Sequence, residues 1–474
     1  MQDFELTIQE AAEAIRRGVM TAVSYAESLI DRAEQAGELN AFIFYDGDQV
    51  LKDARASDQI RKRRGVLGPL HGVPIALKDN IDTATMPTTG GTSTLLDHVP
   101  KQNAVVTQKL IDAGAIIFGK ANLHELASGV TSHNRYFGAV RNPYDSTRIP
   151  GGSSGGVAAA VAAGVVPGGI GTDTGGSVRI PSALCGIVGF RPTSGRWSQQ
   201  GILPVSHTRD TAGPMARTVA DCQLLDSVVT GDDATGLEVS MQGLRLGVPR
   251  AHFWDDLETQ TACLMENVLV RLRDAGAVLI EADIDDIARL DYEAGFPIAL
   301  HETVGDLNAY LATHQLPVDY QQLVAQCDSP DVRKMLQSLA GEAAISTPVY
   351  RHARDVLRPQ LQMRYRDYFA EHDVAAIIFP TTPLPAARIG EDETLMLNGE
   401  QKPTFLTFIR NTSPASVAGI AGITLPVAQT DTGLPLGLEI DTLSNHDAVL
   451  MAIAKAMERI LPALPPPSFG KPRS

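Results

Sequence analysis

The sequence predicts an α/β protein built around a largely buried β-sheet. Short apolar runs alternate with amphipathic helical patterns along both halves of the chain, which is the order typical of strands joined by helices. Hydrophobic residues make up 44% of the 474 residues and charged residues 20%, which is the composition of a globular protein. Because no internal repeat or low-complexity linker divides the chain, we expect one domain over residues 1–474.

The first 130 residues alternate helical patterns with short apolar runs. Thr7 and Glu10 form a capping box at the start of the first helix. Further helices are expected over residues 22–35, in the Lys- and Arg-rich stretch after residue 45, over 104–113 and as a turn over 122–127. Strands are expected at Phe42–Tyr45, Val73–Leu77 and Ala115–Phe118. The second of these strands delivers Lys78 at its end.

Residues 140–217 differ in composition from the rest of the chain. They hold many Gly, Ser and Thr residues and few charges around two helical stretches of small residues. Small residues let the backbone approach a ligand closely, so we expect the site here. Beyond residue 243, strands are expected at 244–248, 277–281, 374–379, 423–428 and 434–440, the last two as a hairpin. Helices are expected at 259–275, over 285–372 as an insertion that covers the site, and at 446–460.

Charge and cysteine content restrict the partners and the compartment. With 40 Lys and Arg against 55 Asp and Glu, the formal net charge is −15, which argues against a nucleic-acid-binding surface. The four cysteines lie far apart without metal-ligand spacing, as in reduced cytoplasmic proteins. The N-terminal segment is acidic and amphipathic, and no apolar run reaches the about 18 residues of a membrane span. We expect a cytoplasmic protein without metal, cofactor, nucleic acid or membrane partner, and leave a homodimer open.

Two stretches resemble known catalytic motifs without fitting them. Gly114–Ala121 nearly matches a phosphate-binding loop, but its interior is an apolar strand and its last position lacks the hydroxyl that would hold magnesium. Gly152–Gly156 satisfies the G-x-S-x-G pattern with Ser154 as nucleophile, and Asp441 and His446 would complete a Ser–Asp–His order. Such a nucleophile turn needs an apolar strand before it, and the ten preceding residues are largely polar.

Two glycine-rich segments remain. They are Gly151–Gly156 and Gly171–Pro181, and Ser177 follows two glycines at the start of an expected helix over Val178–Cys185. Backbone N–H groups of such a turn and of a helix N-terminus point toward one place, which suits an anion or a developing oxyanion. The alternative is that the turn serves only close packing.

Together with Gly72–Asp79, the run Gly151–Thr193 resembles the amidase signature family of Ser–Ser–Lys hydrolases. The resemblance is specific over residues 67–217 and extends in outline over nearly the whole chain. It implies a central mixed β-sheet flanked by α-helices on both faces. The catalytic residues that it implies are Lys78 as the base, Ser153 as the bridging serine and Ser177 as the nucleophile. It also implies that the peptide bond before Ser153 is cis.

The chemistry of these groups requires a neutral Lys78. A free lysine has a pKa near 10.4, and burial can lower it to about 7.5. Neutral Lys78 then accepts a proton from Ser153, which accepts one from Ser177 as that hydroxyl attacks an amide carbonyl. The N–H groups of the turn hold the oxyanion, and neighbouring side chains orient the turn. The turn residues are Thr174, Gly175, Gly176 and Ser177, and the orienting residues are Ser154, Asp173 and Arg179.

Two further segments favour an arylacetic amide as the substrate. Phe190–Ser198 and Gly201–Gly213 are similar to indoleacetamide and mandelamide hydrolases, which cleave primary amides of arylacetic acids. The family alternative is the glutamine-hydrolysing A subunit of a tRNA-dependent amidotransferase, which carries an aspartate where Ile409 stands, shortly before Pro414–Gly419. Arg410 leaves the polarity of the substrate open. Aryl anilides, ureas and carbamates are alternative substrates, and a non-catalytic scaffold subunit is a remote alternative. Side chains from residues 120–137, 300–360 and 405–416 are expected to line the acyl pocket.

Overall fold

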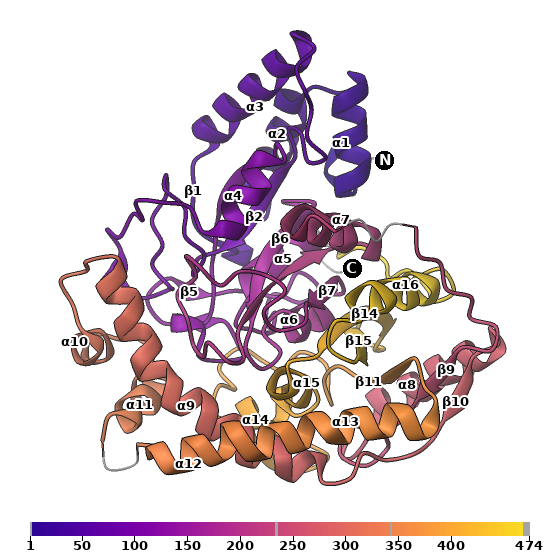
Figure 1. The fold of residues 1–474 in the computed structure, drawn as a ribbon. Coiled ribbons are helices and arrows are strands. Elements are labelled where there is room, and N and C mark those ends of the chain that lie inside the picture. Colours follow the sequence, from indigo (N-terminus) through magenta and orange to yellow (C-terminus); the bar gives the residue numbers. More distant parts are fainter. Residues whose placement is uncertain (1, 233–235, 342–343, 468–474) are drawn as a thin grey trace.

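The short apolar runs of the sequence pair into one mixed sheet in the computed structural model, which describes residues 2–232, 236–341 and 344–467 (Figure 1). Within these residues the sheet has eleven strands, in the order β1-β3-β2-β6-β8-β7-β14-β15-β11-β9-β10. The strands are β1 (Phe42–Tyr45), β2 (Pro74–Lys78), β3 (Ile116–Ala121), β6 (Gly168–Asp173), β7 (Val188–Arg191), β8 (Thr211–Ala216), β9 (Arg245–Gly247), β10 (Val278–Ile280), β11 (Ala376–Pro380), β14 (Ala421–Gln429) and β15 (Pro435–Thr442).

Parallel and antiparallel pairs form separate blocks within this sheet. Strand β2 pairs in parallel with both β3 and β6, while β6, β8, β7, β14 and β15 form a run of antiparallel neighbours. The expected hairpin near the C-terminus is confirmed as β14–β15. Every residue of β6, β8 and β15 is buried, as expected of central strands whose two faces are both covered.

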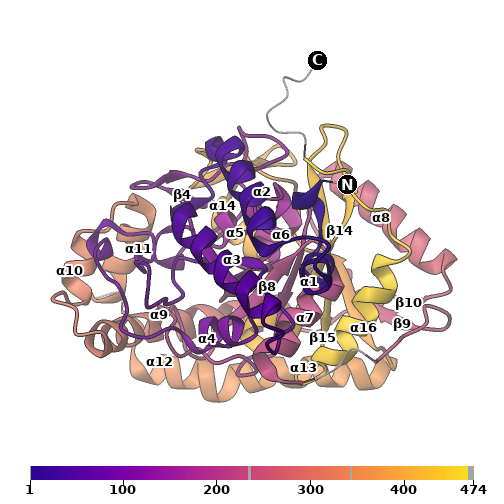
Figure 2. The ribbon, with the colours of Figure 1, turned by 90° about the horizontal axis from the view of Figure 1, so that it is seen from above.

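Helices cover both faces of the sheet (Figure 2). Helices α5 and α6 pack on each other and on central strands, and α7 and α16 form a second such pair. The helices outside the segment 285–372 are α1 (Ile8–Arg17), α2 (Ala22–Gln35), α3 (Gly47–Lys62), α4 (Val105–Asp112), α5 (Gly155–Ala162), α6 (Arg179–Leu184), α7 (Val219–Thr230), α8 (Thr259–Asp274), α14 (Thr404–Ile409), α15 (Ser413–Ala418) and α16 (Asp447–Glu458). The capping box of Thr7 and Glu10 is confirmed at the start of α1.

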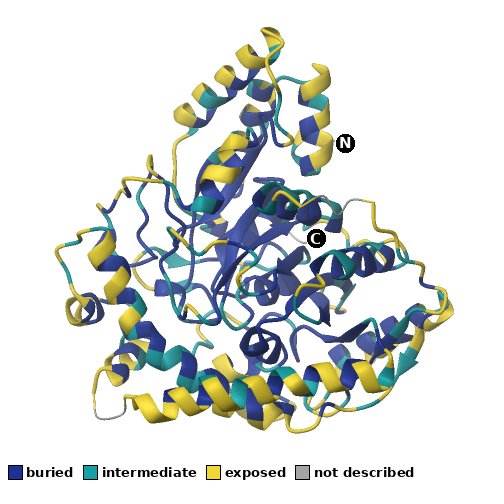
Figure 3. Cartoon of the chain, in the orientation of Figure 1, coloured by how far each residue is buried: buried dark blue, intermediate teal, exposed yellow. Residues whose placement is uncertain are grey.

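The segment 285–372 is helical, as expected. Its helices are α9 (Ile287–Thr313), α10 (Tyr320–Ala325), α11 (Pro330–Leu339), α12 (Thr347–His352) and α13 (Arg358–His372). They present exposed faces outward and apolar faces inward (Figure 3). Helices α9 to α11 share an apolar cluster with Leu95, Leu126 and Leu203, so they pack against loops that follow β2, β3 and β7. Within the described ranges, no helix is both long and apolar enough to cross a bilayer.

Strands β6, β7 and β8 lie at the centre of the sheet, although the sequence does not predict them. Their residues include glycine, proline, threonine and arginine in place of the usual β-branched run. Small residues are needed at these positions because atoms of neighbouring residues approach the backbone closely. A Cβ on Gly169 would contact Ala76, and one on Gly213 would collide with the carbonyl of Phe190. The glycine-rich composition of residues 140–217 is therefore a property of the sheet as well as of the loops. Smaller elements are the hairpin β12–β13 (Thr394–Leu397, Glu400–Pro403), the pair β4–β5 (His133–Asn134, Gly138–Ala139) and a 3₁₀ turn at Glu125–Ala127, where the sequence predicts a turn.

Candidate active site

Lys78 ends strand β2 inside the protein. Its side chain is fully buried, and its Nζ lies 2.8 Å from Ser153 Oγ and 2.7 Å from Thr172 Oγ1. Burial lowers the pKa of Lys78 from 10.5 to about 7, although the carboxylates of Asp173 and Asp210 act in the opposite direction. A large fraction of Lys78 is therefore neutral near pH 7 and can accept a proton from a hydroxyl group.

Ser153 lies just before helix α5 and faces this lysine. The peptide bond between Gly152 and Ser153 is cis, as the resemblance implies. The neighbouring Ser154 is fully buried and turns to the backbone of Thr172, because its hydroxyl donates to the carbonyl at 3.2 Å and accepts from the N–H at 3.3 Å. Of the two adjacent serines, only Ser153 hydrogen-bonds Lys78 within the described residues.

The Ser–Asp–His arrangement around Ser154 is not assembled. His446 is exposed before helix α16, and its Nδ1 lies 3.1 Å from the carbonyl of Ser444. Asp441 is fully buried on strand β15, close to Glu439. Since the Ser154 hydroxyl is engaged with backbone, these three side chains cannot act as a triad in this structure.

Ser177 lies in the loop between strand β6 and helix α6. Its side chain is partly exposed, and its hydroxyl accepts and donates no hydrogen bond within the described part of the chain. The carbonyl of Ser177 accepts from the N–H of Ser154 at 3.2 Å, which joins the backbones of the two serine segments. Helix α6 begins at Arg179 instead of Val178. The hydroxyl of Ser177 is thus available to a ligand.

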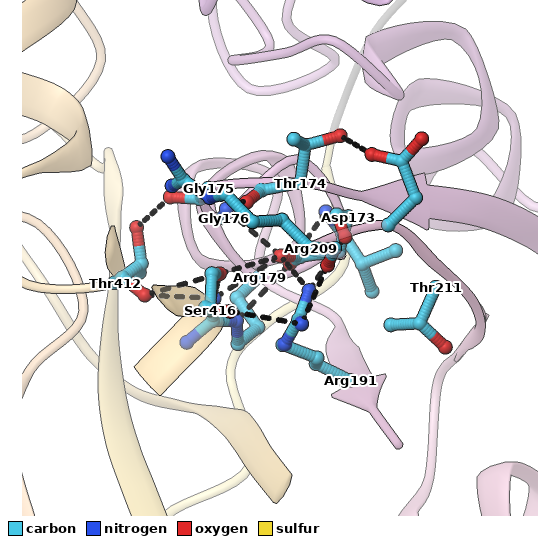
Figure 4. A network of polar contacts seen from close by, with 12 residues as sticks. Asp173, Thr174, Gly175, Gly176, Arg179, Arg191, Arg209, Thr211, Thr412 and Ser416 are labelled. Atoms are coloured by element: carbon cyan, nitrogen blue, oxygen red, sulfur yellow. Dashed lines mark hydrogen bonds and ion pairs between the residues drawn. The ribbon is translucent and has the colours of Figure 1, made fainter. Parts of the chain in front are cut away.

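The buried carboxylate of Asp173 fixes the shape of this loop (Figure 4). Asp173 accepts hydrogen bonds from the N–H groups of Gly176 at 2.9 Å and Val178 at 3.1 Å. The guanidinium groups of Arg179 and Arg191 contact the same carboxylate at 3.1 and 2.9 Å. Burial alone would raise the pKa of Asp173, but the two guanidinium charges outweigh it and hold the pKa well below its usual range. The carboxylate therefore stays charged and keeps the loop in one conformation.

The loop leaves several backbone N–H groups free. The Gly176 N–H donates to Asp173, whereas the N–H groups of Thr174, Gly175 and Ser177 have no acceptor among the described residues. Gly176 has a φ of 131°, and a Cβ there would collide with the Thr412 hydroxyl, so only glycine fits. Of the N–H groups that the sequence singles out as oxyanion donors, that of Gly176 is thus already engaged, and those of Thr174, Gly175 and Ser177 are open.

Three side chains from distant segments hold the outer side of the loop. Thr412 donates to the Gly175 carbonyl at 2.7 Å, and Arg209 Nε donates to the Thr174 carbonyl at 3.1 Å. The Thr174 hydroxyl in turn donates to Asp210 at 2.5 Å. The sequence gives no specific signal for these contacts, because they join residues up to 237 positions apart. Thr172 and Arg191 were missed for another reason, since they lie on strands that the sequence does not predict.

An apolar cluster lies beside the loop. Ile180, one turn after Ser177, packs with Val130, Phe408 and Ile409, and Phe296 of helix α9 packs against this cluster. From the sequence, residues 120–137, 300–360 and 405–416 are expected to line the acyl pocket. All of these cluster residues except Ile180 lie in or near those segments. Ile180 joins this cluster to the loop, because a Cβ on Gly176 would lie 2.8 Å from its side chain.

Comparisons with known proteins point to one family. The family model described as Amidase matches residues 25–451. The indoleacetamide hydrolase of Agrobacterium vitis is 42% identical over 96% of this chain and 97% of its own length. The mandelamide hydrolase of Pseudomonas putida is 40% identical over 98% of this chain and 93% of its own. The crystal structure of the peptide amidase from Stenotrophomonas maltophilia superposes with a TM-score of 0.86 at 30% identity, covering 98% of this chain and 99% of that one.

Proposed function

Because the chain belongs to the amidase family and hydrolyses amide C–N bonds, we propose that its substrate is a primary amide of an arylacetic acid. The observation that carries the proposal is the identity of 42% and 40% to relatives named for indoleacetamide and mandelamide. Both names denote an aromatic ring separated from the carboxamide by one carbon. The products would be the arylacetate and ammonia.

The proposed proton path starts at Ser177 and ends at Lys78. Neutral Lys78 accepts a proton from Ser153, 2.8 Å away, while Ser153 accepts the proton of Ser177. The Ser177 oxygen attacks the amide carbon and forms a tetrahedral adduct. The proton returns through Ser153 to the leaving nitrogen, ammonia departs, and water then hydrolyses the acyl-enzyme by the reverse relay. Thr172 holds the Lys78 amine from the opposite side at 2.7 Å.

The open N–H groups of Gly175 and Ser177 are the proposed oxyanion donors. The negative charge of the adduct develops next to Ser177, and both donors are in place before substrate binds. Loss of one donor of this kind typically lowers kcat by about 10²–10³-fold. Asp173 supports the reaction indirectly, since it orients the loop through Gly176 and Val178.

The apolar cluster beside the loop supports an aromatic acyl group. A ring that binds against the partly exposed Phe296 at the edge of this cluster would gain roughly 25 cal/mol for each Å² of apolar surface buried, so a bicyclic ring gains a few kcal/mol. A glutamine zwitterion would need a charged partner for its amino group. Ile409 cannot supply one, and Arg410 carries the wrong sign for an ammonium group.

We further infer that residues 1–474 act as a single domain and that the helices of 285–372 close the acyl pocket. Helix α9 supports this, since it brings Phe296 to the cluster and contacts α15. These contacts concern the acyl part of the substrate and not the leaving group. Anilides, ureas and carbamates therefore belong in the substrate test.

The test is a panel of amides with ammonia or amine release as the readout. Indole-3-acetamide, phenylacetamide and mandelamide should exceed glutamine in kcat/KM by about a hundredfold or more. A glutamine value equal to theirs would overturn the aryl assignment, as would rapid turnover of a urea or aliphatic amide without any arylacetamide activity.

Labelling identifies the nucleophile separately from the substrate. A fluorophosphonate should add mass to the peptide that contains Ser177, and Ser177→Ala should lose both the label and turnover. Ser154→Ala is the matched control, because its hydroxyl bonds only backbone in the described structure and should not carry the label. Mass on Ser154 in the wild-type protein would refute the proposed nucleophile.

A further inference from the structure

A second cluster of chemically active side chains lies away from Ser177. Asp82, in the loop after β2, faces His98 and His314, and one ligating atom from each lies within 4.8 Å of the others. Asp82 is 1% exposed and His98 is 8% exposed, while the side chain of His314 at the end of α9 is 16% exposed. None of these residues has a part in the proposed mechanism.

The polar contacts already point these groups toward one place. His314 Nε2 lies 3.1 Å from one carboxylate oxygen of Asp82, and Tyr310 donates its hydroxyl hydrogen to the other at 2.6 Å. His98 Nε2 lies 3.2 Å from that hydroxyl. In a tetrahedral zinc site with bonds of about 2.1 Å, neighbouring ligand atoms lie about 3.4 Å apart. Side-chain adjustments on the order of 1 Å would therefore close the set around one ion.

The charge balance of the cluster favours a cation. Asp79 and Asp82 place two carboxylates in this buried region, and Lys120 is paired with Asp79 at 2.9 Å. Asp82 has no lysine or arginine ion-pair partner among the described residues, so its carboxylate is open to a cation.

The chemistry of the donors indicates the class of ion. Two imidazoles and one carboxylate are a donor set that suits zinc and related transition metals better than magnesium.

We propose that Asp82, His98 and His314 bind one transition metal ion such as Zn²⁺, with the fourth position left to water. The partly exposed His314 gives the ion access from solvent. A bound ion would tie the C-terminal end of α9 to the segment that follows Lys78. Tyr310 would then act as the outer hydrogen-bond partner that orients the Asp82 carboxylate.

The test uses the untagged full-length protein after treatment with a chelator and dialysis. Zn²⁺ binding is measured by competition with a chromogenic chelator, and Co²⁺ serves as a spectroscopic probe of nitrogen ligation. We expect one equivalent of Zn²⁺ per chain, no competition by Mg²⁺, and binding at least about tenfold weaker in His98→Gln and His314→Gln. His314→Gln alters a partly exposed residue, so it decides the question if His98→Gln folds poorly by circular dichroism.

Two exposed histidines provide controls. His446→Gln changes a histidine that has no metal-ligand neighbours among the described residues, so it should bind as the wild type does. His207 belongs to another group with Glu302 and Asp306, but Glu302 already accepts hydrogen bonds from Ser206, Thr208 and Tyr350. Loss of binding in His207→Gln would overturn the proposal. So would an absence of stoichiometric binding, or binding that both cluster variants retain.

Discussion

Replacing Lys78 by methionine should make the protein inactive and more stable. The folded protein holds the pKa of this lysine at about 7 instead of 10.5, because the ammonium is fully buried. A fall of about 3.5 units corresponds to about 5 kcal/mol at 1.36 kcal/mol per unit, which is the cost of keeping the protonated lysine folded. Methionine removes this cost but also the hydrogen bonds to Ser153 and Thr172, worth about 1 kcal/mol each. The net gain below pH 7 is therefore about 3 kcal/mol.

The pH dependence separates this explanation from a simple packing effect. The unfolded lysine keeps its proton up to about pH 10.5, whereas the folded one releases it near pH 7. Between these values the unfolded state binds more protons, so wild-type stability rises by about 1.4 kcal/mol per pH unit. Lys78→Met lacks the group. Its advantage should be complete below pH 7, fall by about 1.4 kcal/mol per pH unit above it, vanish near pH 9 and reverse at higher pH.

Urea unfolding of both proteins at several pH values between about 6 and 9 measures this difference. Lys120→Met is the matched comparison, since Lys120 is equally buried but ion-paired with Asp79. That variant should be destabilised by about 3–5 kcal/mol, because it leaves a buried carboxylate without its partner. A constant difference between the wild type and Lys78→Met across this range would refute the lowered pKa, and with it a neutral lysine base.

Three further outcomes follow from the same geometry. In the wild type, kcat/KM for an amide should fall about tenfold per pH unit below a pKa of about 7, and a flat profile from about pH 5 to 8 would assign the proton transfer to a group other than Lys78. Asp210→Asn removes a carboxylate that raises the pKa of Lys78, while an asparagine can still bond Thr174, so the acid limb should move to lower pH; an upward move would contradict the electrostatics. Gly176→Ala should lower kcat on the order of a hundredfold or more without abolishing folding, because its Cβ would push the loop away from Thr412; a wild-type kcat would show that the loop has room.

The sequence predicts the outer elements of the fold better than its centre. Strands β1, β2 and β3 and the β14–β15 hairpin are recognisable, because their apolar runs alternate with helices. Strands β6, β7 and β8 are hidden, because their small residues give no β-branched pattern and are selected by close backbone contacts that only the folded sheet creates. The expected site residues Lys78, Ser153 and Ser177 are identifiable from motif resemblance, although their roles stay predictions.

Contacts between residues far apart in the sequence limit how much of the site can be predicted. Arg209 contacts Thr174 from a loop whose composition gives no functional signal. Thr412 contacts Gly175 from a segment that we compared only with a glutamine-binding position. These partners lie 35 and 237 positions along the chain from the residues they contact, and the packing that brings them together is not encoded in local patterns. The sequence motif therefore locates the loop, whereas the residues that hold it come from the tertiary structure.

The bracing of this loop by late segments of the chain has a consequence for biosynthesis. Arg179 bonds the Thr412 carbonyl at 2.9 Å and Glu439 at 2.9 Å, 233 and 260 residues further along the chain. A nascent polypeptide that has emerged only as far as Ser177 contains every proposed reacting side chain but none of these anchors. Hydrolytic competence should therefore arise only when translation has carried strand β15 clear of the ribosome. Fragments that end before that strand should be inactive.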